Sequence, residues 1–341
     1  MKKVQVKKIL IIRFSSIGDI VLTSPVIRCI KKQLPNVELH YLTKKSFSIL
    51  LESNPYIDKI HLLNENISVT IKELKAENFD FIVDLHNNLR SFYIKWQLEK
   101  QVRSLNKLNI RKWLLVNLKI NLLPHKHIVQ RYLDTVKKIK VTDDGEGLDY
   151  FIPKKDELQL HEFPLTHMHG YAALVIGAQH ATKKLPFEKL KELCEKIQVP
   201  FIVIGGKDDL KTGTELEKLF PYKVINACGK FNLNQSASLI RQAKIVIAHD
   251  TSMMHIAAAF KKKIHSYWGN TVPSFGMYPY FGSRAKYLSL YENNSFIHEV
   301  KNLNCRPCSK IGYNKCPKGH FNCMMKQDFE NLIKELPQVI K

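Results

Sequence analysis

Long hydrophobic runs are missing from this sequence of 341 residues. No uninterrupted apolar stretch approaches the roughly 20 residues that a membrane-spanning helix needs. Near the N-terminus, the apolar run from Ile9 to Ile12 ends at Arg13 and is too short for the hydrophobic core of a signal peptide. We therefore expect a cytoplasmic protein without a spanning helix.

Acidic residues are scarce relative to basic ones, since 31 Asp and Glu accompany 53 Lys and Arg, for a formal net charge of +22. This excess predicts an anionic partner: a phosphate-rich ligand, an acidic lipid or a nucleic acid. A general preference of the organism for lysine is the alternative explanation. The excess is greatest between His86 and Lys140, where thirteen basic residues accompany the two acids Glu99 and Asp134. The basic residues of this segment include Arg90, Arg111, Lys112 and Lys119.

Two common phosphate-binding motifs are also absent. Neither G-x-G-x-x-G nor G-x-x-x-x-G-K-[ST] follows a predicted strand in either half of the chain. A dinucleotide-dependent oxidoreductase or a P-loop enzyme would therefore lack its usual phosphate cradle, and the sequence argues against both classes.

What the sequence does contain is a repeated alternation of short apolar runs with amphipathic segments, which is typical of an α/β protein. One series starts with the run from Ile9 to Ile12, and a second starts with a predicted strand over Tyr171 to Gly177. The segment from Asp143 to Leu165 separates them and has the glycines, prolines and acids of a linker. We predict two Rossmann-like domains with parallel sheets and a final helix, over residues 1–165, 166–325 (including a cysteine-rich tail) and 326–341.

Ser16, Gly18 and Asp19 come directly after the first predicted strand. In open α/β sheets, ligands bind beyond the carboxyl ends of the strands, so these residues are expected at a binding site. Gly18 permits a backbone conformation or a close approach that a side chain would forbid. Asp19 carries a carboxylate that is ionised at neutral pH and could accept a proton from a bound hydroxyl. The alternative is that Ser16 or Asp19 only caps the next helix, and the spacing leaves both interpretations open.

The second series has three polar turns at successive strand ends, and each could face a phosphate or a ribose. Taken singly, each turn is explained by capping and turn chemistry. Together, they favour a site for a nucleotide diphosphate. The candidate residues are Thr182 and Lys183 in the first turn, Lys207 and Asp208 in the second, and Asp250, Thr251, Ser252 and His255 in the third.

Four cysteines lie close together near the C-terminus, with the spacing C-x2-C-x7-C-x6-C. Thiolates so spaced could hold a structural zinc ion in tetrahedral geometry. The alternative is four reduced, packed thiols, because disulfides are rare in the cytoplasm. The residues are Cys305, Cys308, Cys316 and Cys323.

The segment from Arg111 to Leu123 places apolar residues on one face of a predicted helix, with basic residues beside them. Such a helix could lie on an acidic membrane surface, with Trp113 and Leu114 in the interface. More often, such a segment is an ordinary helix that packs on its own domain.

Four stretches together carry a resemblance to a known family: FSSIGDIVLTSPVI, KKLPFEKL after GAQHAT, GGKDD, and AHDTSMMHIAAAFKKKIHSYWGNTVPS. In this order they resemble the lipopolysaccharide heptosyltransferases, family nine of the glycosyltransferases. The resemblance implies a GT-B fold, in which two Rossmann-like domains face each other across a cleft. It also implies acceptor binding on the N-terminal side and nucleotide-sugar binding on the C-terminal side.

The resemblance also implies roles for single residues. Asp19 matches the aspartate regarded as the catalytic base, and Lys183 matches the lysine that contacts the donor diphosphate. The third polar turn and His255 match the loop and helix start that hold the nucleotide-sugar. The chain departs from the family at Ser252, where glycine is usual, and at His249, where Asn or Ser is commoner. No cofactor is required for catalysis in this interpretation, and no D-x-D pair suggests a metal.

We therefore predict an inverting glycosyltransferase that moves a heptose, or a related sugar, from an ADP-activated donor to the lipopolysaccharide inner core. The expected acceptor is an anionic lipid-linked saccharide, and Arg90, Arg111, Lys112 and Lys119 are expected to face it or the inner leaflet of the inner membrane. Nucleic acid is not an expected partner. The alternatives are another sugar-nucleotide enzyme, such as an epimerase, and a basic nucleic-acid-binding protein with a zinc knuckle.

Overall fold

The computed structural model describes residues 6–283 and 285–339, which form two compact units. Neither unit is a single continuous segment of the chain. The segment Asn109–His125 belongs to the second unit, whereas the residues on both sides of it in sequence belong to the first. Unit 1 comprises Met1–Leu108, Lys126–Phe151 and Gly282–Tyr287, and unit 2 comprises Asn109–His125, Ile152–Phe281 and Leu288–Lys341. The domain boundaries at 165 and 325 stay a prediction.

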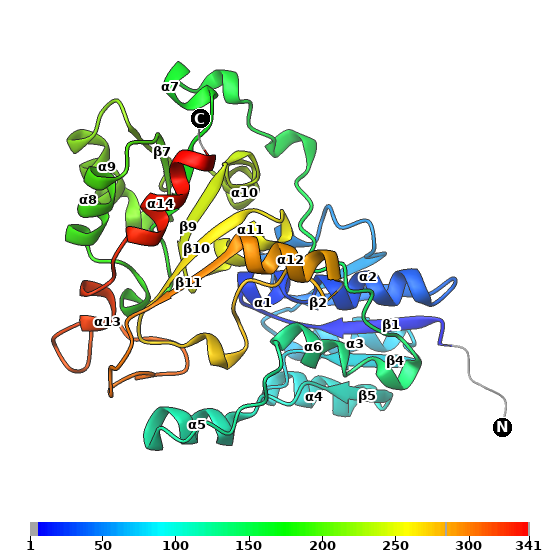
Figure 1. Cartoon of the computed structure of the whole chain (residues 1–341). Coiled ribbons are helices and arrows are strands. Elements are labelled where there is room, and N and C mark those ends of the chain that lie inside the picture. The colour runs from blue at the N-terminus through cyan, green and yellow to red at the C-terminus, as the bar shows by residue number, and fades with distance from the viewer. Residues whose placement is uncertain (1–5, 284, 340–341) are drawn as a thin grey trace. The chain divides into compact units, whose positions relative to one another are not determined.

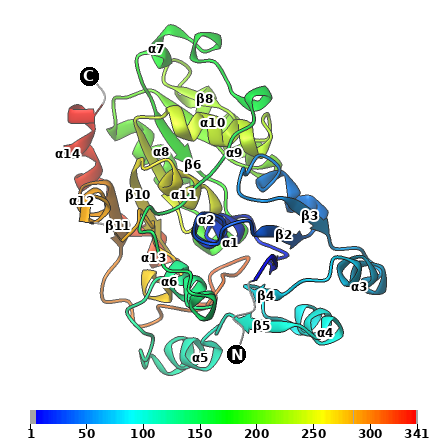
Figure 2. The same ribbon diagram turned by 90° about the vertical axis from the view of Figure 1, so that its right-hand side faces the viewer.

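Unit 1 is built on a five-stranded sheet in the order β3-β2-β1-β4-β5, in which every neighbouring pair is parallel. The central strand is made of aliphatic residues that are fully buried, as expected for a strand covered on both faces. The strands are β1 (Lys8–Ile12), β2 (Glu38–Thr43), β3 (Lys59–Leu62), β4 (Phe81–Asp84) and β5 (Gln101–Ser104). The helices are α1 (Ile17–Val21), α2 (Ser24–Gln33), η1 (Lys45–Leu50), α3 (Ile67–Ala76), α4 (Leu89–Leu98), α6 (Ile128–Leu133) and η2 (Lys137–Ile139). Of these, α3 and α4 lie side by side (Figure 2).

Unit 2 is built on a six-stranded parallel sheet in the order β11-β10-β9-β6-β7-β8. Figure 1 shows β9, β10 and β11 next to one another. The strands are β6 (Ala172–Val175), β7 (Phe201–Ile204), β8 (Val224–Asn226), β9 (Ile245–His249), β10 (Lys263–Trp268) and β11 (Ser295–Glu299). The longer helices are α5 (Asn109–Leu118), α8 (Phe187–Lys196), α9 (Leu210–Leu219), α10 (Leu233–Gln242), α11 (Ser252–Ala259), α12 (Ala285–Asn294) and α14 (Glu330–Val339). The short ones are η3 (Lys154–Asp156), η4 (Leu160–Glu162), α7 (Leu165–Met168), η5 (Ala181–Lys183), η6 (Lys207–Asp209), η7 (Pro273–Phe275) and α13 (Asn322–Met325).

These sheets confirm the predicted α/β class with parallel strands. The strands that the sequence predicts over residues 9–12 and 171–177 are present as β1 and β6. The sequence pattern over residues 46–51 predicts a helical segment, and the structure has a 3-10 helix there, η1 (Lys45–Leu50). Among the described residues, no helix combines the length and the apolar character that crossing a membrane requires.

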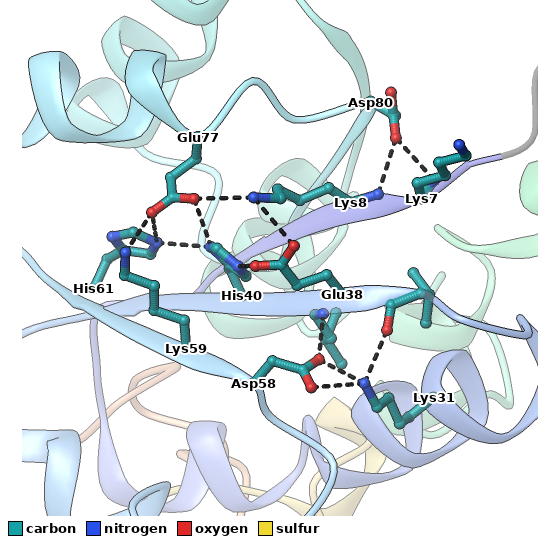
Figure 3. A network of polar contacts seen from close by, with 12 residues as sticks. Lys7, Lys8, Lys31, Glu38, His40, Asp58, Lys59, His61, Glu77 and Asp80 are labelled. Carbon is teal, nitrogen blue, oxygen red and sulfur yellow. Dashed lines mark hydrogen bonds and ion pairs between the residues drawn. The ribbon is translucent and has the colours of Figure 1, made fainter.

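A polar network ties the amino ends of three strands of unit 1 to the end of α3 (Figure 3). His40 Nδ1 lies 2.9 Å from His61 Nε2, and both rings are buried. Glu77 binds Lys59 at 2.5 Å and Lys8 at 3.0 Å, and its hydrogen bond with Lys59 is the main reason that its pKa is lowered to about 2. The ammonium groups of Lys8 and Lys59 neutralise Glu77 and the nearby Glu38. The network therefore stabilises the amino edge of the sheet, whereas the polar turns follow the strands at the carboxyl edge.

Candidate functional site

The site in unit 1 is organised by Arg13, the first residue after β1. Its guanidinium donates from Nε to the carbonyl of Ser15 at 2.7 Å and from Nη1 to the carbonyl of Leu85 at 2.5 Å. Its third nitrogen, Nη2, lies 2.7 Å from Asp19 Oδ2. Two backbone carbonyls thus hold the cation, and the cation in turn holds the carboxylate of Asp19.

Asp19 also closes the first turn of α1. Its Oδ2 accepts hydrogen bonds from the hydroxyl of Ser16 at 2.8 Å and from the backbone N–H of Ser16 at 3.3 Å. The capping contact that the sequence suggested is therefore present. Because the Arg13 and Ser16 contacts all converge on Oδ2, they leave Oδ1 as the oxygen to offer a substrate. Gly18 lies inside α1 with no positive φ, so the backbone conformation at this position does not require glycine.

The environment keeps Asp19 ionised. Burial alone would raise the pKa of this carboxyl, but the charge of Arg13 and the hydrogen bonds from Ser16 outweigh burial and lower it. His86 lies nearby, with its ring centroid 4.7 Å from that of Phe14. Burial, with the charge of Arg13, lowers the pKa of His86 to about 4, so this imidazole is neutral at pH 7. The site in unit 1 is an anion held beside a permanent cation and a neutral ring.

The site in unit 2 brings three strand ends together. Lys183 follows β6, Asp250 follows β9, and Thr271 comes shortly after β10. Lys183 Nζ lies 2.6 Å from Asp250 Oδ2, and the Thr271 hydroxyl donates to the same oxygen at 2.8 Å. The predicted residues Lys183 and Asp250 are therefore neighbours, whereas Lys207 and Asp208 of the second turn are not part of this contact, and the nucleotide-diphosphate site stays a prediction.

The cysteine-rich tail holds the loop that carries Lys183. Tyr313 accepts from the N–H and the hydroxyl of Thr182 at 3.1 Å each, and its own N–H donates to that hydroxyl at 2.8 Å. Arg306 donates to the carbonyls of Gly269 at 2.5 Å and Thr271 at 2.9 Å. Thr182 thus anchors the lysine loop to the tail, and a direct contact with a ligand stays a prediction for it.

The second polar turn has a buried acid that the sequence did not single out. Asp209 accepts from Lys184 Nζ at 2.6 Å and from the backbone N–H of Gly206 at 2.9 Å. Asp209 also lies so close to Gly205 that a Cβ on that glycine would meet its side chain at 2.7 Å. The predicted Lys207 and Asp208 are exposed, and their contacts with a nucleotide stay a prediction.

The third turn forms the start of α11, where Thr251 is the N-cap residue and Ser252 the first helical residue. The free N–H groups of a helix start, and its dipole, attract anions. His255 lies one turn further and is buried. The neighbouring His249 accepts from the N–H of Leu185 at 3.0 Å, and burial lowers its pKa to about 3, so it acts as a neutral structural acceptor.

The predicted basic residues divide between the two units. Arg90 is exposed at the start of α4 in unit 1. In unit 2, Arg111 is exposed on α5, whereas Lys112 Nζ lies 5.9 Å from the centre of the Phe275 ring. Lys119 Nζ donates to the carbonyl of Pro307 at 2.8 Å. Lys112 and Lys119 therefore help to pack α5 within unit 2.

Two groups of side chains in the described part of the chain bring three candidate metal ligands within 4.8 Å of one another. They are His40, His61 and Glu77, and Cys29, Asp143 and Asp144. The four tail cysteines Cys305, Cys308, Cys316 and Cys323 are not among them, so the structure gives no support to the predicted zinc site. Cys308 instead donates its thiol to the carbonyl of Cys305 at 2.9 Å.

Comparison with known proteins agrees with this architecture. The model of glycosyltransferase family 9 (heptosyltransferase) matches residues 68–310. Lipopolysaccharide heptosyltransferase 1 of Campylobacter coli is 24% identical over 295 residues, which is 79% of this chain and 85% of the relative.

Solved structures show the same fold. The structure of Escherichia coli ADP-heptose LPS heptosyltransferase II matches with a TM-score of 0.71 at 16% identity, covering 98% of each chain. An E. coli heptosyltransferase solved with ADP matches with a TM-score of 0.65 at 18% identity, covering 97% of this chain and 99% of the other. The GT-B fold with two Rossmann-like domains is thereby confirmed. The family model covers well over half of the sequence, so the chain belongs to glycosyltransferase family 9, the heptosyltransferase family.

Proposed function

We propose that this glycosyltransferase moves a heptose, or a related sugar, from an ADP-activated donor to the inner core of lipopolysaccharide with inversion at the anomeric carbon. The names of its relatives print ADP-heptose and lipopolysaccharide, and the inner core as acceptor site is part of the proposal. The observation that carries the proposal is the pairing of Arg13 with Asp19, which supplies an ionised carboxylate at the carboxyl end of β1.

Asp19 is the proposed general base. Its Oδ1 would accept the proton of an acceptor hydroxyl while that oxygen attacks the anomeric carbon of the donor. The new C–O bond forms as the bond between the sugar and the diphosphate breaks, and ADP leaves. A carboxylate with a lowered pKa is a weak base, so proton transfer must accompany bond formation and not precede it. A single displacement of this kind inverts the anomeric centre.

Lys183 and the start of α11 are the proposed partners of the leaving diphosphate. A lysine and helical N–H groups at a site that excludes water stabilise a developing negative charge without reorganisation. Asp250 now holds the lysine, and we propose that a donor phosphate takes its place beside Nζ. Thr251, Ser252 and His255 are proposed to hold the nucleotide-sugar at the same turn, with Lys207 and Asp208 at the neighbouring one.

The proposed acceptor is an anionic, lipid-linked saccharide at the inner leaflet of the inner membrane, where the enzyme would bind as a peripheral protein. The net charge of +22 supports this proposal, as do the exposed Arg90 and Arg111.

Sugar transfer is the direct test. Purified protein is incubated with ADP-heptose and a lipopolysaccharide acceptor that lacks heptose, and the product is examined by mass spectrometry and NMR. We expect one heptose to be added with the anomeric configuration inverted, and UDP-hexoses to be much poorer donors. Conversion of the free sugar nucleotide into an epimer, without transfer, would contradict the proposal and favour an epimerase.

A further inference from the structure

Helix α4 of unit 1 exposes large apolar side chains along one face. Leu89 is 89% exposed, Phe92 62%, Tyr93 41% and Trp96 64%. These residues follow the spacing i, i+3, i+4, i+7, which places all four on a single stripe of the helix. A contiguous exposed stripe of this kind marks an interaction site more often than chance exposure does.

The other face of α4 is already used for packing. Ile94 and Leu98 belong to the hydrophobic core of unit 1, and Ser91 is buried with them. The exposed stripe is therefore additional to the face that holds the helix on its sheet. Folding of unit 1 does not account for aromatic side chains at Phe92, Tyr93 and Trp96.

The surroundings of the stripe are basic. Arg90, Lys100 and Arg103 are exposed on or next to α4, where Glu99 is the exposed acid of the helix end. Lys95 Nζ lies 2.6 Å from Oδ2 of the buried Asp84 and neutralises its negative charge. Trp and Tyr with flanking Arg and Lys are typical of segments that lie in the interface of an anionic membrane.

The N-terminal end of the stripe lies at the carboxyl edge of the sheet, the edge that carries Asp19. α4 begins directly after β4, at the same carboxyl edge where Asp19 follows β1. Arg13 donates to the carbonyl of Leu85, and Phe14 contacts His86, so the loop that leads into α4 touches the loop that carries Asp19. A saccharide held at the start of α4 would therefore lie near the loop that carries the proposed base.

We infer that the exposed face of α4, made of Leu89, Phe92, Tyr93 and Trp96, inserts into the interface of an anionic bilayer and brings the lipid-linked acceptor to Asp19. The inference rests on the proposed function for its purpose, but membrane binding itself can be measured without any sugar. A second copy of the chain is a poorer occupant, since a ten-residue helix is about 15 Å long and offers far less than the roughly 800 Å² per partner of a stable interface.

Tryptophan fluorescence tests this surface directly. The chain has three tryptophans, of which Trp268 is buried and Trp96 and Trp113 are exposed. In the Trp113→Phe variant, Trp96 is therefore the exposed reporter. We expect its emission to shift to the blue with vesicles of phosphatidylglycerol and phosphatidylcholine, and to be quenched by brominated lipid. In the Trp96→Phe variant, Trp113 on α5 is the reporter, and we expect a much smaller change.

Vesicle sedimentation measures how much the stripe contributes to the partitioning of the protein into vesicles. The triple variant Leu89→Ser, Phe92→Ser, Trp96→Ser should lower partitioning into anionic vesicles on the order of 100-fold, because three large side chains then no longer leave water. The matched control Leu165→Ser, Tyr222→Ser removes exposed apolar residues of unit 2 and should leave partitioning unchanged. Circular dichroism checks that each variant is folded.

Several results would overturn the inference. They are unchanged partitioning of the triple variant, an equal loss in the control, and a blue shift confined to Trp113. A wild-type dimer in sedimentation velocity that the triple variant dissolves would assign the stripe to self-association instead. Failure of sugar transfer with intact vesicle binding would count against the proposed function alone.

Discussion

The two units each place one carboxylate beside one cation, but the cations are of different kinds. In unit 1, Asp19 faces Arg13, whose guanidinium is held by the carbonyls of Ser15 and Leu85 and cannot lose its charge. In unit 2, Asp250 faces Lys183, a point charge on a flexible stem at the end of a short 3-10 turn. The fixed bonds of Arg13 favour a permanent ion pair with Asp19. The flexible side chain of Lys183 could instead exchange Asp250 for another anion.

This difference assigns different work to the two acids. Arg13 keeps Asp19 charged and positioned, so its free oxygen is available for chemistry. Asp250 also accepts a hydrogen bond from Thr271, which would hold it in place if Lys183 turned to a phosphate as we propose. Under the proposed function, the same type of side chain is a reacting group in one unit and a positioning group in the other.

The largest expected effect is that of removing the charge of Asp19. Asp19→Asn should lower turnover by roughly 10² to 10⁴-fold, the range for loss of a general base, while the affinity for ADP stays unchanged. Steady-state sugar transfer and calorimetry with ADP measure the two quantities. Ser16→Ala is the matched control, since it removes a hydrogen bond from the helix start and keeps the carboxylate. If turnover fell equally in both variants, Asp19 would act only as a cap of α1 and not as the general base.

Lys183→Met should have the next largest effect, on binding. Loss of a charge-assisted bond to the diphosphate should weaken ADP binding by about 1.5 to 3 kcal/mol, or roughly 10 to 150-fold. Lys184→Met is the control, because the neighbouring lysine pairs with Asp209 and not with Asp250. If the control weakens ADP as much as Lys183→Met does, the diphosphate lies at the second turn and not beside Asp250.

Arg13→Lys should have the smallest effect, of a few-fold in turnover, and it tests why unit 1 uses an arginine. A general base works when deprotonated, so activity is lost as the pH falls through its pKa in the folded protein. Arg13 lowers the pKa of Asp19, and a lysine with fewer fixed bonds should lower it less. The acid limb of the pH–rate profile should therefore move to higher pH. An unmoved limb, with folding verified at each pH, would show that Arg13 does not tune the base.

The sequence predicted the strands well where they are continuous apolar runs, as at Ile9 to Ile12. It missed α4, because that helix is apolar on two faces and gives no single-face periodicity. It also missed β5, a four-residue strand at the edge of the sheet with polar and exposed residues. The sequence pattern therefore does not predict the aromatic stripe at Leu89 to Trp96, whereas it does predict the basic helix α5.

For the candidate site, the sequence singles out Asp19, Lys183 and Asp250 because polar residues that follow a buried strand are exposed to ligands in any open α/β sheet, and their roles stay a prediction. The partners that orient them were not found. Thr271 lies 21 residues from Asp250, and Tyr313 lies 131 residues from Thr182, so tertiary packing brings these pairs together. Arg13 is the exception, since a charged residue at the very end of the first apolar run is a signal that could have been used.

The most direct test measures one variant from each unit, Asp19→Asn and Lys183→Met, with both sugar transfer and ADP binding. Single-turnover transfer at saturating donor, and calorimetry with ADP, are measured for Asp19→Asn and for Lys183→Met side by side. The account predicts that Asp19→Asn binds ADP like the wild type but transfers sugar at least about 100-fold more slowly. It also predicts that Lys183→Met loses affinity for ADP. Weakened ADP binding in Asp19→Asn together with a wild-type rate of transfer would contradict it.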